Sequence, residues 1–163
     1  MKILLLMRHA KSSWKDESLS DHDRPLSKRG KEDAPAMGRV IRQEGIIPQL
    51  ILSSTAVRAR KTAELVAEEC EYLHELEFRE DLYSFEPLPF LKALWNLPDN
   101  ISDVMLVGHN PAMEELLTQI TGANESMPTA SLAMIRLPIE SWKELGLQKR
   151  GELVDLWRPK ELK

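Results

Sequence analysis

The chain has 163 residues, a formal net charge of −4 and one cysteine, which suits a single domain, 1–163, whose core needs no disulfide. The negative charge argues against nucleic acid or an anionic membrane as a partner, and every apolar run is shorter than the roughly 18 residues of a membrane span. The lone cysteine and the lack of a signal-peptide pattern predict a cytoplasmic protein.

Short apolar runs alternate with stretches of helical periodicity along the chain. Up to residue 70, the pattern predicts a strand at Ile3–Met7, a loop over 10–25, a helix from Ser27 to about Glu44 that Pro35 would kink or delay, a strand at Leu50–Ser53 and a helix over 55–70. Further along the chain, it predicts a weak strand at Glu75–Glu80, a helix over 87–97, a strand at Asp103–Gly108 and a helix from Pro111 to Gly122 capped by Asn110. Two last strands are predicted over 130–137 and 152–157. Strands that alternate with helices imply an α/β fold. We therefore expect a three-layer α/β/α sandwich around a mostly parallel sheet.

Basic side chains and histidines follow three of the predicted strands. Arg8 and His9 end the first strand, Arg58 lies one turn into the helix after the second, and His109 and Asn110 follow the strand at 103–108. The carboxyl ends of parallel strands share one edge of the sheet, where ligands bind, so we expect these side chains to meet. Two guanidinium groups suit a phosphoryl group, and a neutral imidazole can attack phosphorus. The sequence thus predicts a phosphoryl-transfer site in which cationic side chains replace a metal.

Three segments in order, LLLMRHAKSSW, ILSSTAVRARKTAE and VMLVGHNPAMEEL, resemble the histidine phosphatase superfamily, and within it the SixA-like phosphohistidine phosphatases. The segment DRPLSKRG and the short chain are also similar to SixA-like proteins. The first motif departs from the family pattern at its third residue, which is Ala10 rather than glycine. The resemblance implies that His9 is the nucleophile and that Arg8 and Arg58 bind the phosphate. It implies that His109 is the second histidine of the pocket.

The resemblance also suggests roles for several further positions. Arg24 would be a further basic residue facing the phosphate, and Asn110 with either Ser12 or Ser13 would line the rim. Larger family members carry a proton-donating acid after the third strand. Glu80 or Asp81 could fill this role here, and we favour Asp81 because the acid-Leu-Tyr pattern is similar to that of SixA-like proteins.

The resulting hypothesis is a metal-independent phosphatase, with no cofactor, that acts on a phosphohistidine protein through a covalent phospho-His9. One alternative is a phosphatase or mutase of the same superfamily that acts on a small phosphate ester, and another is a non-catalytic phosphoprotein-binding module. A metal site at His9 and His109 is disfavoured because no third His or Cys stands at ligand spacing. Trp14 would wall the pocket, whereas His22 and His74 are expected in solvent and Cys70 in the core.

Overall fold

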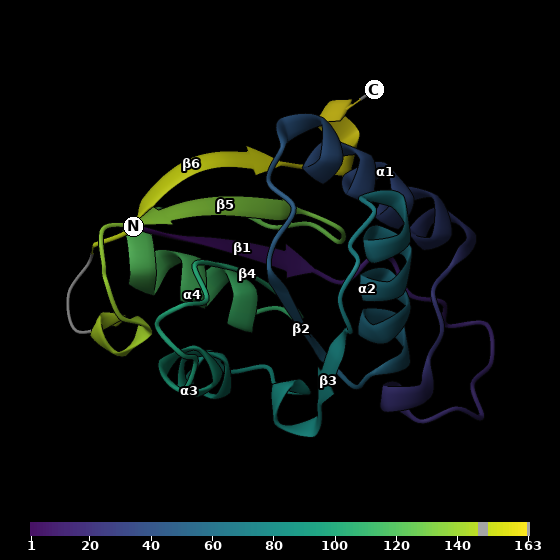
Figure 1. The fold of residues 1–163 in the computed structure, drawn as a ribbon. Helices are drawn as coiled ribbons and strands as arrows, with labels where there is room; N and C mark the ends of the chain where they lie inside the picture. The colour runs from purple at the N-terminus through teal and green to yellow at the C-terminus, as the bar shows by residue number, and fades with distance from the viewer. Residues whose placement is uncertain (147–149, 163) are drawn as a thin grey trace.

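The structure, a computed structural model, describes residues 1–146 and 150–162 and contains a six-stranded sheet in the order β3-β2-β4-β1-β5-β6 (Figure 1). The strands are β1 (Lys2–Arg8), β2 (Leu50–Ser54), β3 (Glu77–Arg79), β4 (Asp103–Gly108), β5 (Leu132–Leu137) and β6 (Glu152–Trp157). Strands β1 to β4 run parallel, whereas β5 pairs antiparallel with both β1 and β6. The sheet is therefore mostly parallel, as predicted.

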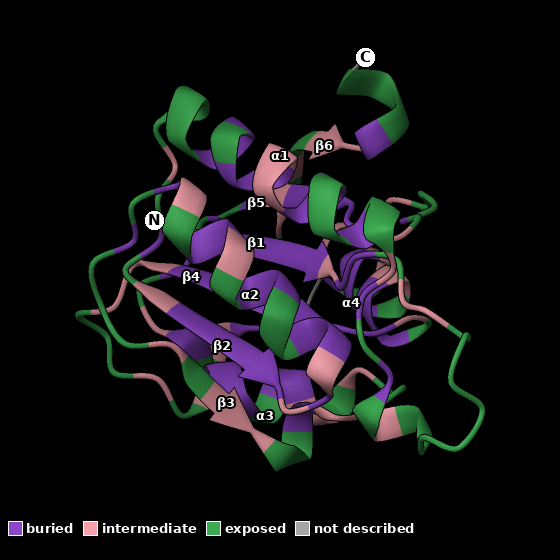
Figure 2. Ribbon diagram, turned by 90° about the vertical axis from the view of Figure 1, so that its right-hand side faces the viewer, coloured by how far each residue is buried: buried purple, intermediate pink, exposed green. Residues whose placement is uncertain are grey.

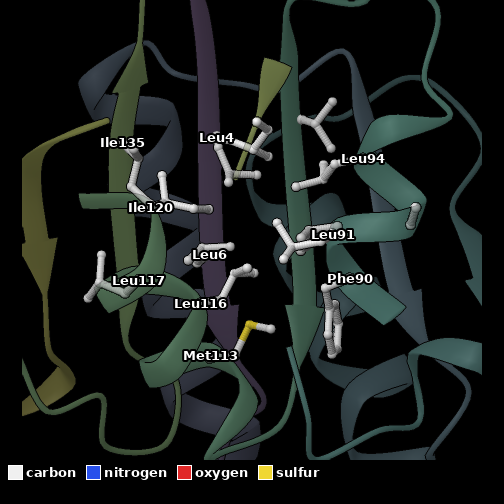
Figure 3. Packing of buried hydrophobic residues seen from close by; sticks show 14 of the residues in the cluster. Leu4, Leu6, Phe90, Leu91, Leu94, Met113, Leu116, Leu117, Ile120 and Ile135 are labelled. Carbon is white, nitrogen blue, oxygen red and sulfur yellow. The ribbon is translucent and has the colours of Figure 1, made fainter. Parts of the chain in front are cut away.

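Four α-helices of the described residues cover the two faces of this sheet (Figures 1 and 2). They are α1 (Lys28–Glu44), α2 (Val57–Glu69), α3 (Leu88–Trp95) and α4 (Ala112–Thr121). Alternate residues of β1 point to opposite faces. Leu5 lies in the core beneath α1 and α2, whereas Leu4 and Leu6 pack against α3 and α4 (Figure 3). This arrangement confirms the predicted three-layer sandwich. Within the described residues, no helix has the length and apolar character to cross a bilayer.

The boundaries differ from the sequence prediction mainly where tertiary packing decides them. Strand β3 is three residues long, shorter than the weak strand predicted at Glu75–Glu80. Pro35 neither delays nor ends α1, which begins at Lys28 with the Oγ of Ser27 accepting a hydrogen bond from the N–H of Gly30. A mid-helix proline costs about 3 kcal/mol. The fully buried side chains of the same helix, such as Met37, offset that loss.

The long loop after β1 folds back along the start of α1. Ser12 and Leu26 form an isolated antiparallel bridge, and a short 3-10 helix spans Asp21–Asp23. The loop backbone also touches α1 directly, because a Cβ added at Gly30 would lie 2.2 Å from the carbonyl oxygen of Lys11. A glycine at position 30 therefore allows the close approach that holds the loop beside the carboxyl end of β1.

Candidate active site

The carboxyl ends of β1, β2 and β4 surround a pocket of about 280 Å³. It is lined by Arg8, His9, Lys11, Ser12, Trp14, Asp21, Arg24, Arg58, Phe85, His109, Asn110 and Thr129. The structure thus brings the four main predicted residues together, with Ser12, Arg24 and Asn110 beside them. Trp14 lines the pocket as well.

His9 presents an unprotonated nitrogen to this pocket. Its Nδ1 lies 2.7 Å from the carbonyl oxygen of Ala10, which can only accept a hydrogen bond, so the proton of the neutral ring sits on Nδ1. The lone pair is then on Nε2, toward which Nε of Arg58 donates over 3.4 Å. Burial lowers the pKa of His9 to about 3, reinforced by nearby positive charge and opposed by the hydrogen bond to Ala10. At neutral pH, His9 is a buried, neutral imidazole.

The second histidine is fixed by the end of β2. Nε2 of His109 lies 2.8 Å from Oγ of Ser54, and the two histidine rings, His9 and His109, have centroids 5.1 Å apart. Burial, followed by the charge of Arg58, lowers the pKa of His109 to about 3. Both pocket histidines are therefore neutral at neutral pH, and the positive charge of the pocket comes from its arginines and Lys11.

Arg8 and Arg58 reach the pocket from β1 and from the first turn of α2. Nη1 of Arg8 donates to the carbonyl oxygen of Met127 over 3.2 Å, whereas its Nε is buried with no hydrogen-bond partner among the described residues. A buried donor without a partner costs about 1–3 kcal/mol. An oxyanion in the pocket would supply the acceptor that this nitrogen lacks.

Asp21, which the sequence reasoning missed, joins the basic residues into one network. Its carboxylate accepts hydrogen bonds from Nη2 of Arg58 at 2.9 Å, from Nη2 of Arg24 at 3.2 Å and from the hydroxyl of Tyr83 at 2.5 Å. Partial burial raises the pKa of Asp21, but hydrogen bonds from Tyr83 and Arg58 outweigh this effect and lower it to about 2. Asp21 is therefore ionised and orients two guanidinium groups.

The rim residues are held by similar contacts. Nη1 of Arg24 donates to Oγ of Ser12 at 2.7 Å. The amide nitrogen of Asn110 donates to Met127 and to Glu114 at 2.9 and 2.8 Å. A larger hollow of about 550 Å³ lies beside α4, but it carries the carboxylates of Glu114, Glu115 and Glu125. Those charges would repel a phosphate, so the histidine pocket is the candidate active site.

His9 follows β1 and shares its pocket with Arg8 and Arg58, the residues that the three sequence segments pointed to. The sequence model of one protein family, the histidine phosphatase superfamily (branch 1), matches residues 4–90 of this chain. This chain belongs to that superfamily. The assignment confirms the family inferred from the three sequence segments.

Individual members of the superfamily show how far the likeness extends. A solved structure from Agrobacterium tumefaciens, assigned as a SixA phosphohistidine phosphatase, superposes with a TM-score of 0.83 and 27% identity, covering 97% of this chain and 98% of that one. An uncharacterised chloroplastic protein of Arabidopsis thaliana is 38% identical over 151 residues, which is 86% of this chain and 69% of the relative. A 2,3-bisphosphoglycerate-dependent phosphoglycerate mutase of Erythrobacter litoralis is 35% identical over 75 residues, which is 45% of this chain and 33% of the mutase. Within the superfamily, the chain is SixA-like.

The structure does not bring Asp81 into the pocket. Its carboxylate is exposed and accepts two hydrogen bonds from Arg79, at 3.1 and 2.8 Å. Glu80 is exposed as well, and neither acid is among the described residues that line the pocket. The reason is local, because a guanidinium two residues earlier in the chain pairs with the Asp81 carboxylate before it can reach His9.

Other predictions outside the main cluster have mixed outcomes. Cys70 is buried in the core and His74 is exposed, as expected. His22 is only partly in solvent, because its Nε2 lies 3.0 Å from Oγ1 of Thr55 and its ring meets Tyr83 edge-on. The methyl group of Ala10 is fully buried in the core, so the alanine at the third motif position fits without displacing the loop.

Tyr83 and Phe85 are further residues that the sequence reasoning did not single out, and Ser54, one of the small hydroxyl residues after the second strand, was given no specific role. Tyr83 and Phe85 each lie with ring centroids 5.5 Å from that of His109, and they form one wall of its surroundings. In the segment that carries Glu80 and Asp81, the aromatic residues rather than these acids contact His109. Ser54 belongs to a matched motif, which was the signal that could have identified it.

Proposed function

We propose that this protein is a metal-independent phosphatase that hydrolyses phosphohistidine on a protein through a covalent phospho-His9. The observation that carries the proposal is the contact between Nδ1 of His9, in a pocket lined by arginines, and the Ala10 carbonyl. Because Nδ1 is committed to that carbonyl, Nε2 holds a lone pair inside a pocket lined by Arg8 and Arg58. A neutral nucleophile among fixed cations suits attack on a phosphoryl group.

The reaction would take two steps. First, Nε2 of His9 attacks phosphorus, a P–N bond forms, and the bond from phosphorus to the substrate nitrogen breaks. The leaving imidazole takes a proton from water, and the hydroxide that remains takes up the proton released by the attacking water of the second step. Second, water attacks phospho-His9, which releases inorganic phosphate and restores the neutral ring. Arg8 and Arg58 would neutralise the phosphoryl oxygens throughout, and His109 would stabilise the charge that develops on them.

The choice of a phosphorylated nitrogen over an ester rests on the acids in the pocket. Asp21 is the single carboxylic acid among the described residues that line it, and its pKa of about 2 leaves it ionised at neutral pH. An alkyl oxygen needs a proton as it leaves, whereas an imidazole nitrogen needs less help. The likeness to a structure assigned as a SixA phosphohistidine phosphatase supports the same substrate.

The test is a comparison of substrates combined with trapping of the intermediate. A phosphohistidine peptide should be hydrolysed with a higher kcat/KM than para-nitrophenyl phosphate. Rapid quenching should reveal a phosphoryl group on the protein that is labile to acid and stable to base. His9→Ala should lose at least about 10³-fold in kcat/KM. Turnover at the wild-type rate by His9→Ala would disprove the covalent mechanism.

A small phosphate ester is the second candidate substrate class, favoured by the partial match to a phosphoglycerate mutase. Higher kcat/KM for 3-phosphoglycerate or para-nitrophenyl phosphate than for every phosphohistidine peptide would select it. A non-catalytic binding module would instead bind the phosphopeptide without turnover.

A cytoplasmic location and the lack of a metal requirement belong to the proposal of a phosphohistidine phosphatase. Activity that survives dialysis against a chelator would support the metal-free reaction.

A further inference from the structure

A second groove, of about 380 Å³, lies next to the catalytic pocket. This flanking groove is lined by Trp14, Asp16, Glu17, Leu19, Asp21 and Arg24. Trp14, Asp21 and Arg24 line both hollows, so a ligand can extend from one into the other without leaving the surface. The groove lies on the loop between β1 and α1, which projects beyond the sheet beside α2 (Figure 1).

Trp14 is an exposed aromatic ring that the protein holds in place. It is 71% exposed, yet the guanidinium carbon of Arg24 lies 3.5 Å from its ring centroid. Arg24 is itself buried and fixed by hydrogen bonds to Ser12 and Asp21. A large ring that is already ordered loses little conformational entropy when a ligand packs on it. Trp14 therefore has the properties of a binding platform.

The remaining residues of the flanking groove combine apolar surface with negative charge. Leu19 is 37% exposed and extends the apolar area, while Asp16 and Glu17 add two carboxylates. The catalytic pocket next to it is cationic, through Arg8, Arg24 and Arg58. A ligand that fills both hollows would carry a phosphoryl group at one end and apolar and cationic groups at the other. A small sugar phosphate lacks that second part, whereas a polypeptide can supply it.

We propose that the flanking groove binds the stretch of substrate polypeptide next to the phosphohistidine. It would prefer an apolar side chain, stacked on Trp14 and Leu19, beside a lysine or arginine that pairs with Glu17. This assignment rests on the proposed function, because it takes a phosphohistidine protein as the substrate. It adds which sequences around the phosphohistidine the enzyme selects and which residues make the selection.

The test uses two phosphohistidine peptides that are identical except for a flanking pair of lysines or glutamates. The wild-type enzyme should hydrolyse the lysine peptide with about fivefold higher kcat/KM, through a lower KM. Glu17→Lys should remove or reverse this preference. Its activity on para-nitrophenyl phosphate should stay unchanged, since Glu17 does not line the catalytic pocket. Leu19→Ala should raise KM for both peptides and leave para-nitrophenyl phosphate unaffected.

A matched control is Glu68→Lys, which makes the same charge change at an exposed position near the far end of α2. It should keep the wild-type preference for the lysine peptide. Equal kcat/KM for the two peptides with the wild-type enzyme would overturn the flanking-groove assignment while leaving the phosphohistidine activity in place. Hydrolysis of para-nitrophenyl phosphate without hydrolysis of either peptide would instead overturn the proposed function, and the groove assignment with it.

Discussion

Nε2 of His109 lies 2.8 Å from Oγ of Ser54, and that oxygen also accepts a hydrogen bond from the backbone N–H of Ala56. Ser54 is fully buried at the end of β2, so its hydroxyl has no access to solvent. Nδ1 of His109 is buried with no hydrogen-bond partner among the described residues. Within the described part of the chain, the Ser54 hydroxyl is therefore the one hydrogen-bond partner that fixes the His109 ring, which otherwise only packs against neighbouring rings.

Ser54→Ala should lower kcat by about tenfold with a smaller change in KM, because it releases the His109 ring without touching the arginines. The lost hydrogen bond should also lower the free energy of unfolding by about 1–2 kcal/mol. Steady-state kinetics and urea denaturation measure the two effects. Ser54→Thr keeps the hydroxyl and should recover most of kcat. If Ser54→Thr is as slow as Ser54→Ala although it is equally stable, Ser54 does not position His109.

The depressed pKa values of the two histidines predict how stability depends on pH. His9 and His109 each have a pKa of about 3 in the folded protein, below the ordinary value of 6.5. Between these two pH values the unfolded chain binds more protons than the folded protein. The free energy of unfolding therefore decreases as the pH falls from about 6.5 toward 3. Two such groups give a slope of roughly 2.7 kcal/mol per pH unit near pH 5.

Urea denaturation between pH 7 and pH 4.5 checks this prediction. The free energy of unfolding should be flat near neutral pH and then fall. His9→Ala should remove about half of the slope, and His9→Ala combined with His109→Ala should remove most of it. A wild-type slope equal to that of the double variant would mean that both histidines titrate in the folded protein as they do in the unfolded chain.

Asp21 is expected to orient the arginines rather than to compete with the substrate. Asp21→Ala removes the carboxylate shared by Arg58 and Arg24, so each guanidinium group loses part of the hydrogen bonding that fixes its direction. We expect kcat/KM to fall by about tenfold, mainly through KM. Calorimetric titration with inorganic phosphate should show weaker binding in parallel. Asp23→Ala, an exposed carboxylate two residues away, serves as the control. Tighter phosphate binding by Asp21→Ala would show that the carboxylate competes for the arginines.

Gly30→Ala tests the contact between α1 and the active-site loop. The added Cβ would lie 2.2 Å from the carbonyl oxygen of Lys11, so the backbone has to move. We expect a loss of about 1–3 kcal/mol in the free energy of unfolding, together with reduced activity because the loop continues from His9. Thermal unfolding and kinetics measure these changes. Lys31→Ala, the next and exposed residue of the same helix, should leave both near wild type. A fully active and equally stable Gly30→Ala would contradict the tight contact.

Much of the fold could be predicted from the sequence because its signals are local. The apolar runs of β1 and β4 each predict a buried strand, and the polar residues at their ends begin the candidate site. The order of the elements follows from the alternation of strand and helix patterns. That Arg8 and His109 line the same pocket follows from the rule that parallel strands end at one edge of the sheet. These parts of the site were therefore predictable without coordinates.

The rest depends on contacts between distant segments. Asp21 lies in a polar loop whose sequence does not indicate which side chains it will contact. Its hydrogen bond with Tyr83 joins residues that are 62 positions apart in the chain. Asp81 failed to reach the pocket for the opposite reason, since the nearby Arg79 pairs with it. Local patterns predict which residue types are present. They do not predict which of several acids the folded chain directs toward the arginines.

The central place of β1 has a consequence for exchange of amide hydrogens. This strand pairs with β4 on one side and β5 on the other, from end to end. Its amides should exchange with solvent only when the whole domain unfolds, whereas much of the loop that follows is exposed and should exchange through small local openings. His9 lies at the junction of these two regimes. Under the proposed mechanism, the nucleophile would lie directly after the slowest-exchanging strand, and the substrate would contact a loop that exchanges much faster.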